Sequence, residues 1–214
     1  MKYPIQVLFR EYFEGILAAV FLALFLRFFV VNILYIPSEN LSPNLIRGDF
    51  VLGWRLSYGF PLPLMKGERL NLKVPKRGDL ISFRFPGDEE QIIIRRVVGL
   101  PGDRISSKGG VISVNGISLV LNSLDGLKAR EQAFESDYEY DIMVNTTMEI
   151  EELEVPENKI FVLSDNRLKS DDSRDWGFVP VQNVESRIAL IWLSVSNSDE
   201  GISLQWPRIL QSVK

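Results

Sequence analysis

The 214-residue sequence contains no histidine and no cysteine. Without histidine it has neither a Ser-His-Asp triad nor the commonest protein ligand for zinc. Without cysteine it has no disulfide, no thiolate nucleophile and no cysteine-bound zinc. A hydrolase with this composition would need an unusual general base, and we expect neither a metal ion nor any other cofactor.

The sequence also lacks an excess of positive charge. It has 24 Lys and Arg residues against 28 Asp and Glu residues, which gives a formal net charge of -4. Because nucleic-acid-binding domains usually carry a basic surface, we expect no nucleic-acid partner. Hydrophobic residues make up 46% of the chain, which is enough for one core, or for one core and a smaller lobe.

One long stretch is almost free of polar residues. It covers residues 15–36 as GILAAVFLALFLRFFVVNILYI and is interrupted only by Arg27 and Asn32. A helix of this length crosses a hydrocarbon core of about 30 Å, and apolar residues on all its sides favour lipid over a protein core. We predict a membrane anchor over residues 12–30, with Arg27 reaching the far interface and Phe28–Ile36 leaving as a strand.

A cleaved signal peptide is the alternative for the same stretch. No small-x-small cleavage site follows it, so we prefer an uncleaved, single-pass anchor surrounded by membrane lipid. Lys2 and Arg10 precede the anchor. The positive-inside rule then predicts that residues 1–11 form a cytoplasmic tail and that the body lies on the other side of the membrane.

After the anchor the sequence is typical of β structure interrupted by glycine and proline. Asn115-Gly116, between two short apolar runs, is the strongest hairpin signal. Only residues 122–136 look helical or loop-like. The runs that we predict as strands are Phe50–Trp54, Asp79–Phe85, Gln91–Val98, Lys159–Leu163 and Arg187–Ser196.

Three short segments carry most of the functional information. They are PSENLSPNL at residues 37–45, RRVVGLPGD at residues 95–103, and SDNR at residues 164–167 with DSR at residues 172–174. Their residues and their order along the chain closely resemble those of bacterial signal peptidase I. This family cuts signal peptides from exported proteins with a serine nucleophile and a lysine general base.

The resemblance covers nearly the whole chain and implies its architecture. It implies a mainly β fold, in which residues 31–104 and 156–214 form an antiparallel catalytic-type lobe and residues 105–155 form a smaller inserted lobe. One N-terminal transmembrane helix precedes them. It also implies the bacterial plasma (inner) membrane as the location, with the C-terminal body on the extracytoplasmic face, and exported preproteins or their signal peptides as partners.

Both chemical residues of the family are replaced in this chain. At the matching positions, Asn40 stands for the nucleophilic serine and Arg95 for the lysine base. An amide is a very poor nucleophile because its nitrogen lone pair is delocalised into the carbonyl. A guanidinium stays protonated, so it donates hydrogen bonds but accepts no proton. Each replacement should abolish cleavage by a separate mechanism.

The surroundings of Arg95 follow from strand alternation. Period-2 geometry places Ile93, Arg95 and Val97 on one face of a strand. A charged group among such neighbours needs hydrogen-bond partners, and the side-chain oxygen of Asn40 is one candidate. The alternative is that Arg95 reaches solvent at the rim of the sheet.

Ser38 and Ser42 flank Asn40 and would share its face if this segment were a strand. The resemblance gives Ser38 the role of an oxyanion-hole donor, and neither serine has an evident base, so we expect neither to replace the nucleophile. By the same resemblance, the residues that contact substrate are Ser38, Leu41, Pro43 and Ile93.

The third segment is expected to support the site. In the family, the residues that match Asp172 and Arg174 form a structural ion pair, and the residue that matches Ser170 lies near the lysine base. Ser164 replaces a glycine, which could crowd the site. The matching set is Asp165, Asn166, Arg167, Ser170, Asp172 and Arg174.

Three functions remain open at this stage. The first is a signal-peptidase-like pseudoenzyme that binds or assists exported polypeptides, with an active paralogue or assembly machinery as a further partner. The second is a working signal peptidase with relocated catalytic groups. The third is a structural β domain on an anchor, which would show no affinity for small-x-small peptides.

Overall fold

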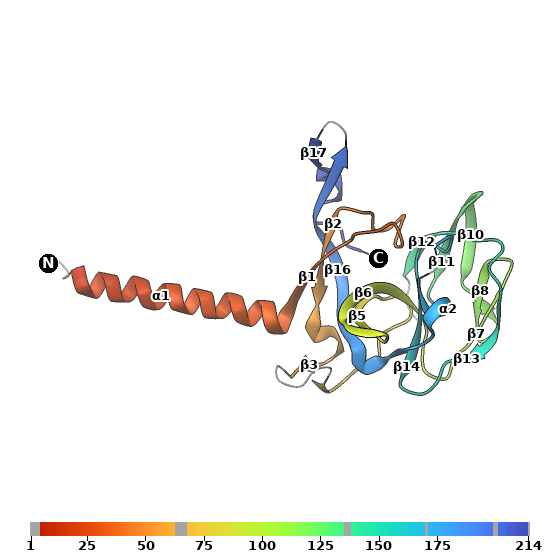
Figure 1. The fold of residues 1–214 in the computed structure, drawn as a ribbon, viewed down its shortest axis with the longest axis horizontal. Coiled ribbons are helices and arrows are strands. Elements are labelled where there is room, and N and C mark those ends of the chain that lie inside the picture. Colours follow the sequence, from red (N-terminus) through yellow and green to blue (C-terminus); the bar gives the residue numbers. More distant parts are fainter. Residues whose placement is uncertain (1–4, 63–67, 135–137, 170, 199–200, 214) are drawn as a thin grey trace.

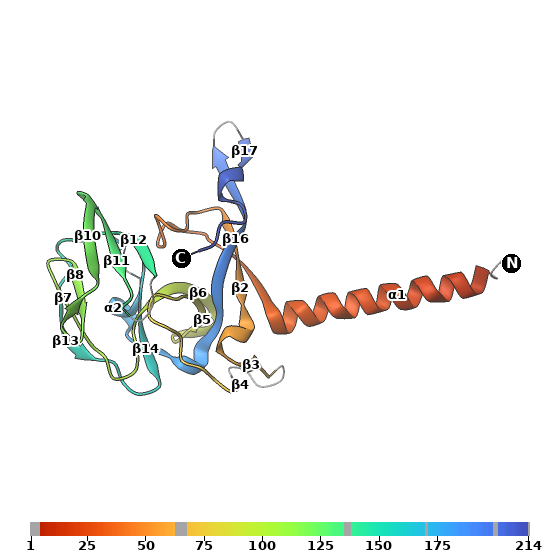
Figure 2. The ribbon, with the colours of Figure 1, turned by 180° about the vertical axis from the view of Figure 1, so that it is seen from behind.

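The computed structural model describes residues 5–62, 68–134, 138–169, 171–198 and 201–213. The predictions made for Lys2 and Ser170 lie outside these residues. A long N-terminal helix, α1 (Ile5–Phe25), extends away from a body made of strands. The two opposite views place the helix α1 at one end of the molecule and strands β7, β8 and β13 of residues 104–154 at the other (Figures 1 and 2).

The apolar N-terminal stretch is helical, as predicted. After α1 the chain makes a π-helical turn, η1 (Leu26–Val30), and then enters strand β1 (Val31–Tyr35). The prediction that the strand begins at Phe28 was therefore wrong by three residues. Residues 10–30 form a helix long and apolar enough to cross a membrane, with a mean hydropathy of 2.2 and no burial against the body.

The body is organised around one large antiparallel sheet, in the order β1-β2-β16-β5-β6-β14-β15, with β17 paired to β16. The predicted strands are all present, although several are longer than expected. The bounds are β2 (Asp49–Trp54), β5 (Leu80–Phe85), β6 (Asp88–Gly99), β14 (Lys159–Leu163), β15 (Val179–Pro180), β16 (Val184–Ser198) and β17 (Gly201–Leu204).

Smaller sheets complete the body. One has the order β13-β7-β8-β9, a second has the order β10-β11-β12, and β3 (Phe60–Pro61) pairs with β4 (Arg69–Leu70). The other bounds are β7 (Arg104–Lys108), β8 (Val111–Val114), β9 (Ile117–Ser118), β10 (Val120–Asp125), β11 (Lys128–Gln132), β12 (Glu139–Met143) and β13 (Ile150–Glu154). The helical turns of the body are η2 (Arg55–Tyr58), α2 (Ser173–Trp176), η3 (Val181–Asn183) and η4 (Trp206–Arg208).

The Asn115-Gly116 hairpin is confirmed. It joins β8 to β9, and both turn residues have positive φ, 53° at Asn115 and 79° at Gly116. A two-residue turn with this geometry needs residues that tolerate the left-handed region, and Asn-Gly is the preferred pair.

The prediction of a helix or loop over residues 122–136 was wrong for the described part, because β10 and β11 form a hairpin there. The sequence KAREQ is rich in helix-forming residues, but its burial alternates along β11. Ala129 packs in a small apolar cluster, and Glu131 forms a buried ion pair with Arg167. Tertiary burial therefore overrides the local preference, and Ser136 lies outside the described residues.

The core combines apolar clusters with buried charge. Ile81, Phe83, Ile93 and Val97 pack together in one cluster, whereas Ile94 belongs to another, as the alternation along β6 predicts. Two ion pairs, Arg96 with Asp165 and Arg167 with Glu131, have fully buried side chains. The mainly β, antiparallel fold class is thus confirmed, and the expected division into two lobes remains a prediction.

Candidate functional site

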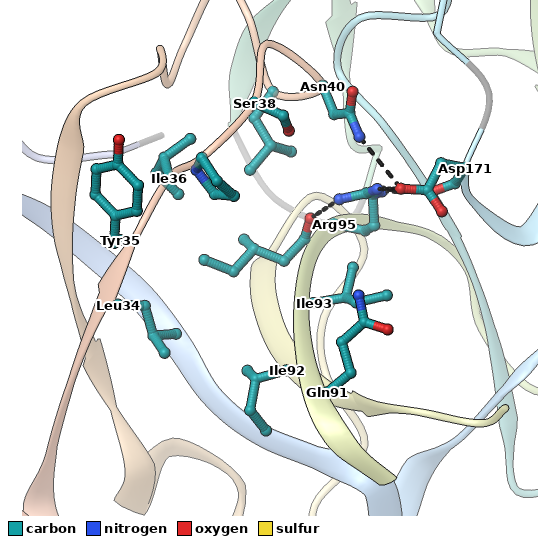
Figure 3. A pocket seen from close by; sticks show the side chains of 13 residues that line it. Leu34, Tyr35, Ile36, Ser38, Asn40, Gln91, Ile92, Ile93, Arg95 and Asp171 are labelled. Carbon is teal, nitrogen blue, oxygen red and sulfur yellow. Dashed lines mark hydrogen bonds and ion pairs between the residues drawn. The ribbon is translucent and has the colours of Figure 1, made fainter. Parts of the chain in front are cut away.

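A cavity of about 140 Å³ separates the end of β1 from the middle of β6. Residues between Leu34 and Leu41 line one side, Gln91–Arg95 line the other, and Asp171 closes one end. Figure 3 shows these side chains around the opening. Two sequence segments that are far apart in the chain therefore meet at one site.

The first segment approaches this cavity as a series of turns. Residues 37–45 do not form the strand in which Ser38, Asn40 and Ser42 would share a face. Pro37 and Pro43 lack the N–H group that a sheet ladder needs, and the turn is closed by a hydrogen bond from Leu45 N to Leu41 O. Ser38 and Asn40 still line the cavity, whereas Ser42 does not.

The third segment fixes this turn in place. Asn166 donates its backbone N–H to the Asn40 carbonyl at 2.9 Å and its side-chain amide to the Glu39 carbonyl at 3.2 Å. Asn44 Nδ2 donates to Asp165 Oδ2 at 2.7 Å. The position of Asn40 is therefore set by groups more than 100 residues later in the chain.

Arg95 is buried, with only 5% of the residue exposed. Its Nε and Nη2 donate to the backbone oxygen of Asp171 at 2.8 and 2.6 Å, and Nη2 also donates to the Asp171 carboxylate at 2.8 Å. Nη1 donates to the Ile94 carbonyl at 2.6 Å. The expected alternative, in which Arg95 reaches solvent at the sheet rim, was wrong.

Burial lowers the pKa of Arg95, while the nearby carboxylates of Asp171, Asp172 and Asp165 act in the opposite direction. All three of its nitrogens donate hydrogen bonds. This is the arrangement of a protonated guanidinium, which has no lone pair available for a proton. Arg95 can therefore hold a negative charge but cannot serve as a general base.

Asn40 and Arg95 meet through Asp171 rather than directly. Asn40 Nδ2 donates to Asp171 Oδ2 at 3.3 Å, and no hydrogen bond joins Asn40 to Arg95, both of which the structure describes. The Asn40 oxygen, one candidate partner for Arg95, does not accept its hydrogen bonds; Asp171 does, and a carboxylate is the stronger acceptor for the cation. Figure 3 shows the carboxylate between the two side chains.

Sequence reasoning missed Asp171. Its side chain is 58% exposed, and its backbone has a positive φ of 112°, which is unusual for a residue other than glycine. A signal was present, because a buried arginine needs a carboxylate and the third segment offers Asp171 next to Asp172. The sequence alone does not show which of the two carboxylates faces Arg95.

Buried ion pairs form the base of the site. Arg96 Nε donates to Asp165 Oδ1 at 2.6 Å, and its guanidinium lies 4.0 Å from the centre of the Tyr140 ring. Arg167 Nη2 donates to Glu131 at 2.7 Å. Neither Arg96 nor Glu131 was among the predicted site residues, because only the folded chain brings them to their partners Asp165 and Arg167.

Asp172 connects two parts of the third segment. It caps α2, forms an ion pair with Arg174 at 2.7 Å and accepts the backbone N–H of Ser164 at 2.9 Å. Ser164 is fully buried, and its Oγ has no hydrogen-bond partner in the described part of the chain. The hydroxyl therefore adds bulk at this position without a compensating contact.

Of the residues expected to contact substrate, the structure brings three to the cavity. Ser38, Leu41 and Ile93 line it, and Pro43 does not. Leu41 and Ile93 are buried, which gives this part of the lining an apolar surface. Within the described residues, no group of three or more acidic side chains lies together that could hold a metal ion.

Comparison with known proteins identifies the family. A family model described as "Signal peptidase, peptidase S26" matches residues 9–193. This match spans most of the chain, which therefore belongs to the signal peptidase family S26.

Individual proteins similar to this chain are named signal peptidase I. The chain is 31% identical over 214 residues to signal peptidase I of Pseudomonas fluorescens, covering 90% of this chain and 74% of that protein. It is 31% identical over 215 residues to signal peptidase I of Pseudomonas aeruginosa, with the same coverage of each chain. A crystal structure of a signal peptidase I from Enterococcus faecalis is 31% identical in sequence. The match covers 54% of this chain and 97% of that chain, with a TM-score of 0.38.

Proposed function

We propose that this protein is a membrane-anchored signal peptidase homologue that has lost peptidase activity and uses its cleft to bind exported polypeptides. In this proposal Asn40 and Arg95 occupy the positions of the family's nucleophile and general base. The observation that carries it is the Arg95–Asp171 ion pair, which lies at 2.8 Å beside Asn40. A Ser-Lys mechanism needs a hydroxyl and a neutral amine at this point, and neither is present.

The site also argues against relocated catalytic groups. Among the described residues that line the cavity, Ser38 is the only serine, and the lining also includes the cation of Arg95 and the carboxylate of Asp171. The carboxylate already accepts hydrogen bonds from Arg95 and Asn40. Because an ion-paired carboxylate is a weak base, we expect Ser38 to remain a hydrogen-bond donor rather than a nucleophile.

Peptide binding has a structural basis in the free edge of β6. Along one edge of β6, residues Ile92–Arg96 pair with β5. Along its other edge, β14 pairs with β6 only from Arg96 onward. In the described chain no strand pairs with the other side of Gln91–Ile94, which faces the cavity. An extended peptide could add a strand there, while the small cavity would accept small side chains.

The clients that we propose are exported preproteins or their signal peptides, as the names of the relatives suggest. An active signal peptidase or an assembly machinery is a further candidate partner. The helix over residues 10–30 supports a membrane anchor, and we propose a cytoplasmic tail and a body on the extracytoplasmic face of the bacterial plasma membrane.

Cleavage of a model preprotein by the purified full-length protein in detergent tests this proposal. We expect no product from the unmodified protein, weak cleavage from the Asn40→Ser, Arg95→Lys double variant, and none from either single variant, because nucleophile and base act as one unit. Adding Ser164→Gly should increase the activity of the double variant by relieving the crowding beside the base.

Three results would contradict the proposal. Turnover by the unmodified protein that is lost in Ser38→Ala or Ser42→Ala would identify a substitute nucleophile and support the active enzyme. A folded triple variant without any cleavage would show that the cleft differs from the family's in more than these residues. A domain with no peptide affinity at all would instead be structural.

A further inference from the structure

A second cavity lies where the anchor joins the body. It has a volume of about 360 Å³ and is formed by the turn η1, the start of β1 and the first residue of η2. Its polar lining residues are Arg27, Asn32 and Arg55, and the rest of its lining is apolar. The cavity is separate from the peptide cleft, since the two have no lining residue in common.

The cationic groups in this cavity have unused hydrogen-bonding capacity. Arg27 makes no ion pair or side-chain hydrogen bond with any described residue. Arg55 donates from Nη2 to Glu185 at 2.6 Å, but its buried Nε has no partner in the described part of the chain. Arg27 and Arg55 therefore line the same space, and each has N–H capacity that no described residue uses.

The charge around Arg55 is not balanced. Glu185 is shared by Arg55 at 2.6 Å, Arg84 at 2.5 Å and Arg69 at 3.7 Å. One carboxylate thus faces three guanidinium groups, and Arg27 adds a further positive charge at the cavity. An anionic ligand would be attracted to this point, and a ligand with an ammonium group would be repelled.

The cavity lies at the level where a membrane interface is expected. Arg27 is three residues from the end of the apolar helix at Val30, and Trp54, next to Arg55, pairs with Val31 in the sheet. Trp54 is 40% exposed, and Phe60 stacks on Phe29 with 5.3 Å between ring centres. Aromatic side chains are enriched at the headgroup level, and arginine near a helix end extends to the same level.

From this arrangement we propose that the cavity binds the headgroup phosphate of one anionic glycerophospholipid. Arg27 and Arg55 donate hydrogen bonds to the phosphate oxygens, and guanidinium suits this geometry. Asn32 provides a further polar contact, while Leu26, Phe28 and Ile33 face the glycerol and upper acyl chain. The inference rests on the proposed membrane anchor but not on the proposed role of the peptide cleft.

Native mass spectrometry of the full-length protein in neutral detergent tests the site. We expect one phosphatidylglycerol to be retained, with phosphatidylcholine bound at least about five-fold more weakly. Arg27→Gln should weaken phosphatidylglycerol binding by about five-fold, the effect of one arginine near anionic lipid. Arg104→Gln, which changes an exposed arginine of β7, is the matched control and should have no effect.

A second variant and a competitor make the test decisive. Arg55→Gln should also weaken phosphatidylglycerol binding. Because this variant loses the contact with Glu185, its melting temperature must be measured to show that it is still folded. Arg27→Gln changes an exposed side chain without such a contact and does not have this difficulty. Equal binding of the two lipids, or unchanged binding by Arg27→Gln, would overturn the proposal. Displacement of the lipid by millimolar inorganic phosphate would show that the site takes free phosphate and would also overturn it. Cleavage and peptide-binding assays of the cleft are independent of these results.

Discussion

At the scale of single residues, Asp171 determines the electrostatic state of the cleft. Its carboxylate and backbone oxygen together accept three hydrogen bonds from Arg95, and the carboxylate also accepts one from Asn40. Burying a guanidinium without acceptors would be very costly, so Asp171 is what permits an arginine at this position. The same carboxylate would also act on any other cation placed there.

We therefore predict an effect of Asp171 on restored activity. In the Asn40→Ser, Arg95→Lys variant, the Asp171 carboxylate stabilises the lysine ammonium and raises its pKa. Adding Asp171→Asn should lower that pKa, so the rising limb of the cleavage–pH profile should move to lower pH. The control is Asp88→Asn, which changes an exposed residue at the start of β6, the strand that carries Arg95. A profile that does not move would mean that Asp171 turns away from the lysine.

Asp172 should contribute to acid stability. Burial raises the pKa of Asp172, but the hydrogen bonds from Arg174 and Ser164 outweigh this effect, and the pKa lies below its ordinary value. A depressed carboxylate pKa stabilises the fold above the unfolded-state value of about 3.9, and this stability is lost as the pH falls through the folded-state pKa.

Asp172→Asn should accordingly lower the free energy of unfolding by about 3 kcal/mol at neutral pH, since it leaves Arg174 without its ion-pair partner. The loss should shrink as the pH falls below about 4. Denaturant unfolding at several pH values measures both effects. Glu154→Gln, in the exposed pair with Arg104, is the control and should change stability by less than about 0.5 kcal/mol. Equal effects of the two variants would contradict the assignment.

At the scale of elements, β6 has two different halves. Arg96, Val97 and Gly99 pair with β14, and Arg96 also pairs with β5, whereas Ile92–Ile94 pair only with β5 and present their other edge to the cavity. Strand β5 offers no free edge, because it is paired by both β6 and β16. The available edge for a peptide is therefore on β6.

A peptide that adds to this edge should bind through its backbone. We expect an Ala-x-Ala peptide to bind, and the same peptide with N-methylated amides to lose at least ten-fold in affinity, because each lost backbone hydrogen bond costs about 1 kcal/mol. A Trp-x-Trp peptide should bind more weakly, since the cavity holds only about 140 Å³. Fluorescence anisotropy of labelled peptides measures these affinities. Equal weak binding of all three would favour a structural domain.

At the scale of the whole molecule, the anchor and the body are physically distinct. No residue in the most apolar 18-residue part of the helix is buried, so this exposed surface must be covered by something other than the described part of this chain. Lipid fits this requirement, because a helix satisfies its own backbone hydrogen bonds. The full-length protein should then resist extraction by alkaline carbonate, and extraction would contradict the anchor.

The absence of cysteine permits a direct test of orientation. Single cysteines introduced by Lys108→Cys in the body and Glu11→Cys in the tail would be the only thiols in the protein. If the body lies on the extracytoplasmic face, a membrane-impermeant maleimide should label intact cells at position 108 and not at position 11 until the membrane is opened. The reverse pattern would invert the proposed topology.

The sequence by itself determined the family resemblance, the apolar helix and most strands. These features depend on local information: a long apolar run, period-2 alternation, and an Asn-Gly turn whose backbone preference is intrinsic. It also fixed the chemical limits of Asn40 and Arg95, since neither an amide nor a guanidinium changes its basic chemistry with context.

Only the tertiary structure decided which groups meet. The turn over residues 37–45 is held by Asn166 and Asp165, the β10–β11 hairpin by burial of Glu131 against Arg167, and Arg95 by Asp171. Each of these contacts joins residues at least 36 positions apart. Local propensity cannot encode such contacts, because their free energy comes from burying charge and apolar surface together in the folded chain.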